Sequence, residues 1–217
     1  MVDLLTIPFE PIQVYELLTF LVALLFLKLK KNTVNQLLFL ILFVNIATEM
    51  LTTFIHYEEK PRLLFTISVF LHNSFWLFLL SKSIRKSAIF LPLFCCYILF
   101  SILNLFFMEG IEKFNFNTFI IGAFLYLVLF IYGSFHELKK ENYNFFLANQ
   151  YLLLFAPVLY FFGLSFVFGF KSRMLTETII FGDVSLYEFI ISFVNIVYYS
   201  LVNIYIYREK KMNHGIK

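Results

Sequence analysis

The sequence predicts an all-α fold of the polytopic membrane class, with residues 1–217 forming one bundle of seven transmembrane helices. Hydrophobic residues make up 61% of the chain and charged residues 14%, and the mean hydropathy is +0.84, so there is too little polar sequence to cover a water-soluble domain. Apolar runs separated by short charged connectors fill almost the whole chain. At ~1.5 Å per residue each run crosses about 30 Å of hydrocarbon, or nearly so. The predicted helices lie near Ile12–Leu29, Thr33–His56, Arg62–Ser81, Ser87–Phe107, Asn117–Leu138, Phe145–Phe168 and Val184–Tyr207.

The apolar runs indicate helices and not the strands of a closed barrel. Barrel strands alternate apolar and polar residues over about ten positions, because one face meets lipid and the other meets the lumen. Leu37–Val44 and Ala123–Phe130 are apolar on nearly every side. Helices are the alternative that satisfies all backbone polar groups within lipid.

The first two helices carry acidic residues inside apolar sequence. Glu16 lies only about 6 Å inside the boundary of the first helix, so its side chain could reach either the headgroup region or a pocket. In the second helix Asn45, Glu49 and Thr52 recur at steps of four and three, which places them on one face. A lipid-facing stripe of this kind is costly. We therefore expect it to meet neighbouring helices, either through packing hydrogen bonds or as a ligand or proton site.

The third and fourth helices present adjacent pairs of side chains. His72 and Asn73 lie about ten residues in from the start of the third helix, and His72 is either a sensing group or a buried contact between helices. Cys95 and Cys96 diverge by about 100° around the fourth helix, so they cannot form a metal site by themselves, and we expect them to be small packing residues.

The last three helices combine packing signals with one polar face. Gly122 and Gly133 predict a smooth packing surface on the fifth helix, and Pro157 predicts a kink in the sixth. In the seventh, Glu188 and Asn195 follow helical spacing, and Asn195 falls at the depth of Asn45 and His72. Glu188 also fits a capping box with Ser185, in which it would satisfy free amide groups.

These polar residues predict a shared site. Glu16, Glu49 and Glu188 lie in the predicted outer half, and no Lys or Arg is expected deep enough to neutralise them, so they must be protonated, hydrated or bound to a cation. We expect an outward-open cavity for ligand binding or proton sensing. Its expected floor is Asn45, His72, Asn73 and Asn195. The sequence predicts no metal ligands, no cofactor and no catalytic residue.

The distribution of basic residues predicts orientation, because positively charged connectors stay on the cytoplasmic side. One side holds most of the 17 Lys and Arg, namely Lys28, Lys30, Lys31, Lys82, Arg85, Lys86, Lys139, Lys140, Arg208, Lys210, Lys211 and Lys217. The other side holds Lys60, Arg62, Lys113, Lys171 and Arg173. The N-terminus is therefore expected outside and the C-terminus in the cytoplasm. The abundance of Phe, Ile, Lys, Asn and Tyr is what A+T-rich codons encode, which indicates a low-GC bacterium and hence its inner membrane.

The connectors predict no attached soluble domain, because the longest spans only Gly169–Asp183. Glycine-rich phosphate loops, HExxH and GxSxG are missing from the sequence. The net charge of +3 reflects membrane anchoring and not nucleic-acid binding. Any signal passed inward must go through a separate polypeptide.

The layout resembles small bacterial seven-helix membrane proteins that are encoded beside separate sensor histidine kinases. The resemblance rests on the length, the seven spans, the basic end Tyr205–Lys211 and the segment Tyr151–Phe170 with its Pro157. No functional residues are carried over from that group. The resemblance implies a sensory or accessory subunit in the membrane whose partner is a histidine kinase or another signalling protein.

Two other classes stay open, and an enzyme is less favoured than a protein without catalytic activity. Transporters of the SWEET type also have seven helices with the N-terminus outside, and Asn73 and Asn195 fall in the corresponding third and seventh helices. A repeat between the first and last three helices and the paired prolines are missing here. A membrane-embedded lipid enzyme of the lysoplasmalogenase type, which uses acidic residues, is the other alternative.

Overall fold

The computed structural model describes residues 11–29, 32–54, 60–84, 87–169 and 178–213. This part of the chain is almost entirely helical, which confirms the all-α class. Six of its helices are long and apolar enough to cross a membrane. They are α2 (Thr33–Phe54), α3 (Lys60–Ser83), α4 (Ser87–Leu103) with its π-helical extension η2 (Asn104–Met108), α5 (Phe116–Lys139), α7 (Asn149–Gly169) and α9 (Leu186–Asn213).

The first helix, α1 (Pro11–Phe26), is shorter than the sequence predicted. Its 16 residues cover about 24 Å. The chain leaves the helix at Phe26, and side chains at the start of α2 bind the carbonyl groups that follow. The amide of Asn35 donates to the carbonyl of Lys28 at 3.4 Å, and the amide of Gln36 donates to that of Leu29 at 2.9 Å. These bonds replace the helical partners that the carbonyl groups would otherwise lack.

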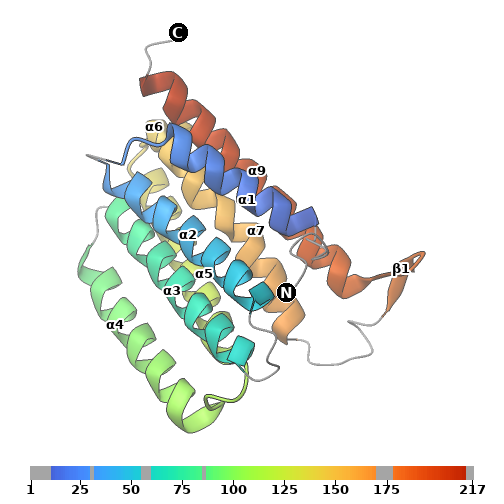
Figure 1. The fold of residues 1–217 in the computed structure, drawn as a ribbon. Coiled ribbons are helices and arrows are strands. Elements are labelled where there is room, and N and C mark those ends of the chain that lie inside the picture. Colours follow the sequence, from blue (N-terminus) through green and yellow to red (C-terminus); the bar gives the residue numbers. More distant parts are fainter. Residues whose placement is uncertain (1–10, 30–31, 55–59, 85–86, 170–177, 214–217) are drawn as a thin grey trace.

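The six helices α1, α2, α3, α5, α7 and α9 form a closed ring, because each packs against the next and α9 returns to α1 (Figure 1). Helix α4 lies outside this ring and packs on α3 and α5. Helices α1, α3, α5 and α9 begin at one end of the bundle, which we name the cavity end. They finish at the opposite end, the basic end, where Lys82, Lys139, Lys140, Lys210 and Lys211 lie.

An aromatic core fills the middle of the ring. The indole of Trp76 on α3 lies edge-on to Tyr126 of α5 and to Tyr198 of α9, with ring centroids 6.1 Å apart in both pairs. Phe161 of α7 contacts Tyr126 at 5.0 Å. All four side chains are fully buried. This layer separates the polar groups of the two ends.

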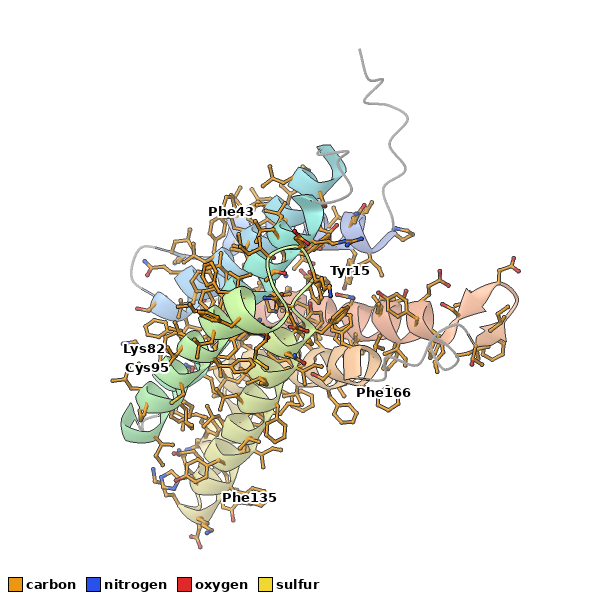
Figure 2. All side chains as sticks on the ribbon, turned by 90° about the horizontal axis from the view of Figure 1, so that it is seen from below. Tyr15, Phe43, Lys82, Cys95, Phe135 and Phe166 are labelled. Atoms are coloured by element: carbon orange, nitrogen blue, oxygen red, sulfur yellow. The ribbon has the colours of Figure 1, made fainter. Side chains whose placement is uncertain are left out.

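Large apolar side chains are exposed over the outer surface of the bundle. Phe43, Phe135 and Phe166 project from the bundle in Figure 2, and each is 44% exposed or more. An apolar surface that surrounds a protein on many helices needs lipid or another protein as its neighbour. Cys95 and Cys96 are also exposed on α4, so the prediction that they are packing residues is wrong.

The loops add three features that the sequence analysis missed. A short helix, α6 (Tyr143–Leu147), precedes α7, and the extended backbone of Ala148 separates the two. The fourth helix ends in the π-helical turn η2. A hairpin of β1 (Ile179–Phe181) and β2 (Val184–Ser185) leads into α9, and Phe181 pairs with Val184 across a turn in which Gly182 has a φ of 56°.

Several predicted features lie outside the described residues. They include the end of the predicted second helix at His56 and part of the connector Gly169–Asp183. They also include seven of the basic residues used for orientation, which are Lys30, Lys31, Arg85, Lys86, Lys171, Arg173 and Lys217. The seven spans and the orientation of the termini stay predictions.

Candidate functional site

A cavity of about 480 Å³ runs into the ring from the cavity end. All six ring helices line it, and α4 contributes no lining residue. Its volume lies within the usual range of small-molecule sites, about 300–1,000 Å³. Its polar side chains gather on α1, α2, α3 and α9.

One wall of the cavity is acidic. Glu16 of α1 and Glu49 of α2 both line it, and they lie close enough for their charges to repel each other. The amide of Gln13, one helical turn before Glu16, donates to Glu49 Oε2 at 2.9 Å. Glu16 is 5% exposed, and its Oε1 has no hydrogen-bond partner among the described residues. A buried carboxyl oxygen without a partner is costly, and sites for ligands are where such groups persist.

The inner part of the cavity is a chain of polar contacts between three helices. His72 Nδ1 lies 2.8 Å from Asn45 Oδ1, and because an amide oxygen only accepts, the imidazole donates from Nδ1. The amide group of Asn45 in turn donates to the hydroxyl of Tyr199 at 3.4 Å. That hydroxyl also lies near the carboxyl of Glu16. The chain therefore connects the acidic wall on α1 to the histidine on α3.

The proton position on His72 leaves a free acceptor. With Nδ1 as the donor, Nε2 carries the lone pair. The side chain is 4% exposed, and Nε2 has no partner among the described residues. Aromatic rings surround the imidazole, with Tyr160 and Phe161 at 5.5 and 5.9 Å between ring centroids. This histidine is held in one orientation inside an apolar layer.

The wall across the ring from Glu16 and Glu49 is aromatic. Phe168 of α7 contacts Phe114, Phe116 and Phe119 at 5.7, 5.4 and 5.1 Å between ring centroids. All four phenylalanines line the cavity. The order of helices in the ring places α5 and α7 opposite α1 and α2. The cavity thus has one carboxyl-bearing side and one side of aromatic faces and edges.

Arg62 of α3 also lines the cavity, at its mouth, where its side chain is exposed. It forms no ion pair with any carboxylate of the described residues. No Lys or Arg is predicted deep enough to neutralise the acidic groups, and Arg62, exposed at the mouth, does not contradict that prediction. The helix starts two residues earlier than predicted, which places Arg62 inside its first turn.

Five of the seven predicted site residues line this cavity. They are Glu16, Asn45, Glu49, His72 and Asn195. The amide of Asn195 donates to the carbonyl of Ile191 in its own helix at 2.9 Å. The geometry brings these side chains together but leaves untested whether they bind a ligand or a proton.

The other two predicted residues lie elsewhere. Asn73 is one residue beyond His72, so it points about 100° away and donates to the carbonyl of Phe119 on α5 at 3.3 Å. Glu188 forms the capping box, in which its carboxylate accepts from the amide of Ser185 at 3.0 Å while its own amide donates to the Ser185 hydroxyl at 3.2 Å. Neither residue lines the cavity.

Sequence reasoning missed Gln13, Arg62 and the aromatic wall. Helical spacing puts Tyr199 one turn after Asn195 on the same polar face, but the predicted site residues do not include it. Nothing distinguishes the five lining phenylalanines from the other 27 of the 32 in the chain until the helices are placed. Within the described ranges, no three His, Cys, Asp or Glu side chains lie close enough to hold a metal ion.

Comparison of the chain with protein-family models, with curated proteins and with solved structures finds no match. The site's own geometry is therefore the basis for inferring a function.

Proposed function

We propose that this chain is a multi-pass protein of the bacterial inner membrane that acts as a sensory or accessory subunit. In this proposal the cavity opens outward, binds a small molecule, and passes the binding event to a separate signalling protein. The single observation that carries it is the cavity of about 480 Å³ with buried polar atoms that the described protein leaves without partners. Such a site is the default location for a ligand. The resemblance to proteins encoded beside histidine kinases supports the choice of partner.

Helix α9 is the element that could carry the signal. It has 28 residues and so spans about 42 Å, more than a bilayer core. In its first half Asn195 and Tyr199 line the cavity, and near its end lie Lys210 and Lys211. A ligand that moves Tyr199 therefore acts on the same rigid helix that presents the basic end to a partner.

Among the described residues, hydrogen bonds between helices close the basic end, which favours binding over passage through the protein. The hydroxyl of Tyr205 on α9 donates to Asn35 of α2 at 2.6 Å. The amide of Gln150 on α7 donates to Ser83 of α3 at 2.7 Å. Between these bonds and the cavity lies the aromatic core. A receptor needs only the open end, whereas a carrier must also open this closed end.

Trp76 allows a direct test, because it is the only tryptophan in the chain and its ring lies 6.5 Å from that of His72. The purified protein in lipid nanodiscs is titrated with small amines, sugars, carboxylates and amino acids while Trp76 emission and the melting temperature are followed. We expect one chemical class to change both in a saturable way. If no class does so, the proposal is wrong.

Transport is the second candidate, because the shape of the cavity is also compatible with it. A cavity that is open at one end and closed near the middle is also what one state of an alternating-access carrier presents. Pro157 in α7 removes a helical hydrogen bond and could serve as the hinge. Uptake of the ligand identified by Trp76 emission into proteoliposomes separates the two candidates. Binding without uptake supports the sensory or accessory role.

A further inference from the structure

We infer that the cavity's ligand is a small organic cation, with an ammonium group held between Glu16 and the aromatic wall formed by Phe114, Phe116, Phe119 and Phe168. This inference rests on the proposed function, because it names the chemical class that the site would bind. It is carried by the unpartnered atoms, the aromatic wall and the distribution of charge.

Two buried polar atoms of the lining side chains, Glu16 Oε1 and His72 Nε2, have no partner among the described residues. Glu16 Oε1 is a carboxyl oxygen, and His72 Nε2 carries a lone pair because Nδ1 holds the proton. A buried acceptor is satisfied only by a group that donates. An ammonium ligand supplies several N–H donors, or in its quaternary form a diffuse positive charge, and carries no acceptor at its charged end.

The wall that faces the carboxyls suits a cation. Phe168 with Phe114, Phe116 and Phe119 forms a group of rings whose centroids lie 4.7 to 5.7 Å apart where they touch. The face of an aromatic ring carries negative electrostatic potential, and it attracts an ammonium group within about 6 Å. The attraction is larger where water is excluded. The negative potential of the ring faces disfavours anions.

The charges also differ with depth. Glu16 is buried, whereas the only basic side chain among the described lining residues, Arg62, is exposed at the mouth, where water screens it. The inner part of the cavity therefore favours positive charge. Arg62 opposes the entry of a cation, so its removal is expected to strengthen binding. An anionic ligand would show the opposite response.

The experiment uses the full-length protein in nanodiscs and two matched pairs of probes. Choline is compared with its neutral isostere 3,3-dimethylbutan-1-ol, and phenethylamine with 2-phenylethanol, with Trp76 emission and melting temperature as readouts. We expect at least one cation to bind at least tenfold more tightly than its neutral partner. Glu16→Gln should weaken that binding tenfold or more, Phe168→Leu by severalfold, and Arg62→Gln should tighten it.

Glu188→Gln is the matched control, because it removes a carboxylate at the same end of the bundle that does not line the cavity. It should bind the cation as the unaltered protein does. If Glu16→Gln does not fold, Arg62→Gln and Phe168→Leu still decide the question. Equal affinity for a cation and its neutral isostere, or tighter binding of carboxylates, overturns the inference while leaving the proposed binding function intact. If neither the paired probes nor any compound of the wider panel changes Trp76 emission and the melting temperature, the inference and the proposed binding function are both wrong.

Discussion

The two ends of the bundle use the same polar residue types for different purposes. At the basic end Asn35 of α2 accepts from Tyr205 of α9 and donates to the carbonyl of Lys28 in the segment after α1. At the cavity end Asn45 also joins helices, but its partners His72 and Tyr199 line the cavity, and in the described part of the chain His72 Nε2 has no partner. The same polar residue type therefore links helices at one end and forms part of a cavity wall at the other.

Truncation of Tyr205 should give the largest loss of stability. Its ring is buried, so Tyr205→Ala creates a cavity and leaves Asn35 without its donor, and we expect a loss of about 3–5 kcal/mol. Tyr207→Ala, two residues along the same helix, removes an exposed ring and should cost far less. Thermal unfolding in detergent measures both. Equal losses of stability in the two variants would contradict the view that the bond between Tyr205 and Asn35 stabilises the basic end.

Gly122→Ala should give the next largest loss of stability. It tests the close packing of Gly122 against Asn73, whose amide donates to α5. A Cβ at Gly122 would overlap the amide of Asn73 and come within 2.9 Å of the Tyr97 ring. Forced overlaps of this kind cost about 1–3 kcal/mol. Gly169→Ala is the control, since nothing lies within 4 Å of its Cβ position. A Gly122→Ala protein as stable as the control would mean that α3, α4 and α5 pack loosely.

Removing one hydroxyl at each end compares the ends directly. Tyr205→Phe leaves the Asn35 oxygen without its donor in a closed interior, which should cost about 1–3 kcal/mol. Tyr199→Phe removes a weaker bond of 3.4 Å next to a cavity, so the expected loss of stability is smaller and the effect on the Trp76 response to ligand is larger. If Tyr199→Phe lost more stability than Tyr205→Phe, or Tyr205→Phe changed the Trp76 response to ligand more, the two ends would not differ in role as described.

The smallest effect is expected for Glu188→Gln. The capping box satisfies amide groups at the start of α9 and lies outside the cavity. We expect a small decrease in melting temperature and unchanged ligand binding. A loss of binding in this variant would show that Glu188 belongs to the site after all.

The fold class and the helix positions could be predicted because lipid imposes a simple rule of length and hydropathy. The same rule says little about where helices stop in loops. It missed the short α6, the hairpin before α9 and the early end of α1, which depends on the side chains of Asn35 and Gln36. These features depend on local hydrogen bonds between segments that the sequence does not place side by side.

The candidate site was predictable in part for a related reason. Depth brings Asn45, His72 and Asn195 to one level, helical spacing puts Glu49 on the same face as Asn45, and a polar stripe must avoid lipid. Depth alone cannot give the direction in which a side chain points. Asn73 therefore entered the prediction beside His72, although it faces α5. The aromatic wall needed the ring order of the helices, which no periodicity within one helix contains.

The most direct test of the central claim is the accessibility of the cavity wall to water from one side of the membrane. Ser68, which lines the cavity, is changed to Cys in a protein whose exposed Cys95 and Cys96 are replaced by Ser, and Ser101→Cys in the same background is the buried control. A membrane-impermeant thiol reagent is added outside intact cells. The account predicts modification at position 68 and none at 101. Absence of modification at position 68 in a folded protein, or modification only from the cytoplasmic side, would contradict an outward-open cavity.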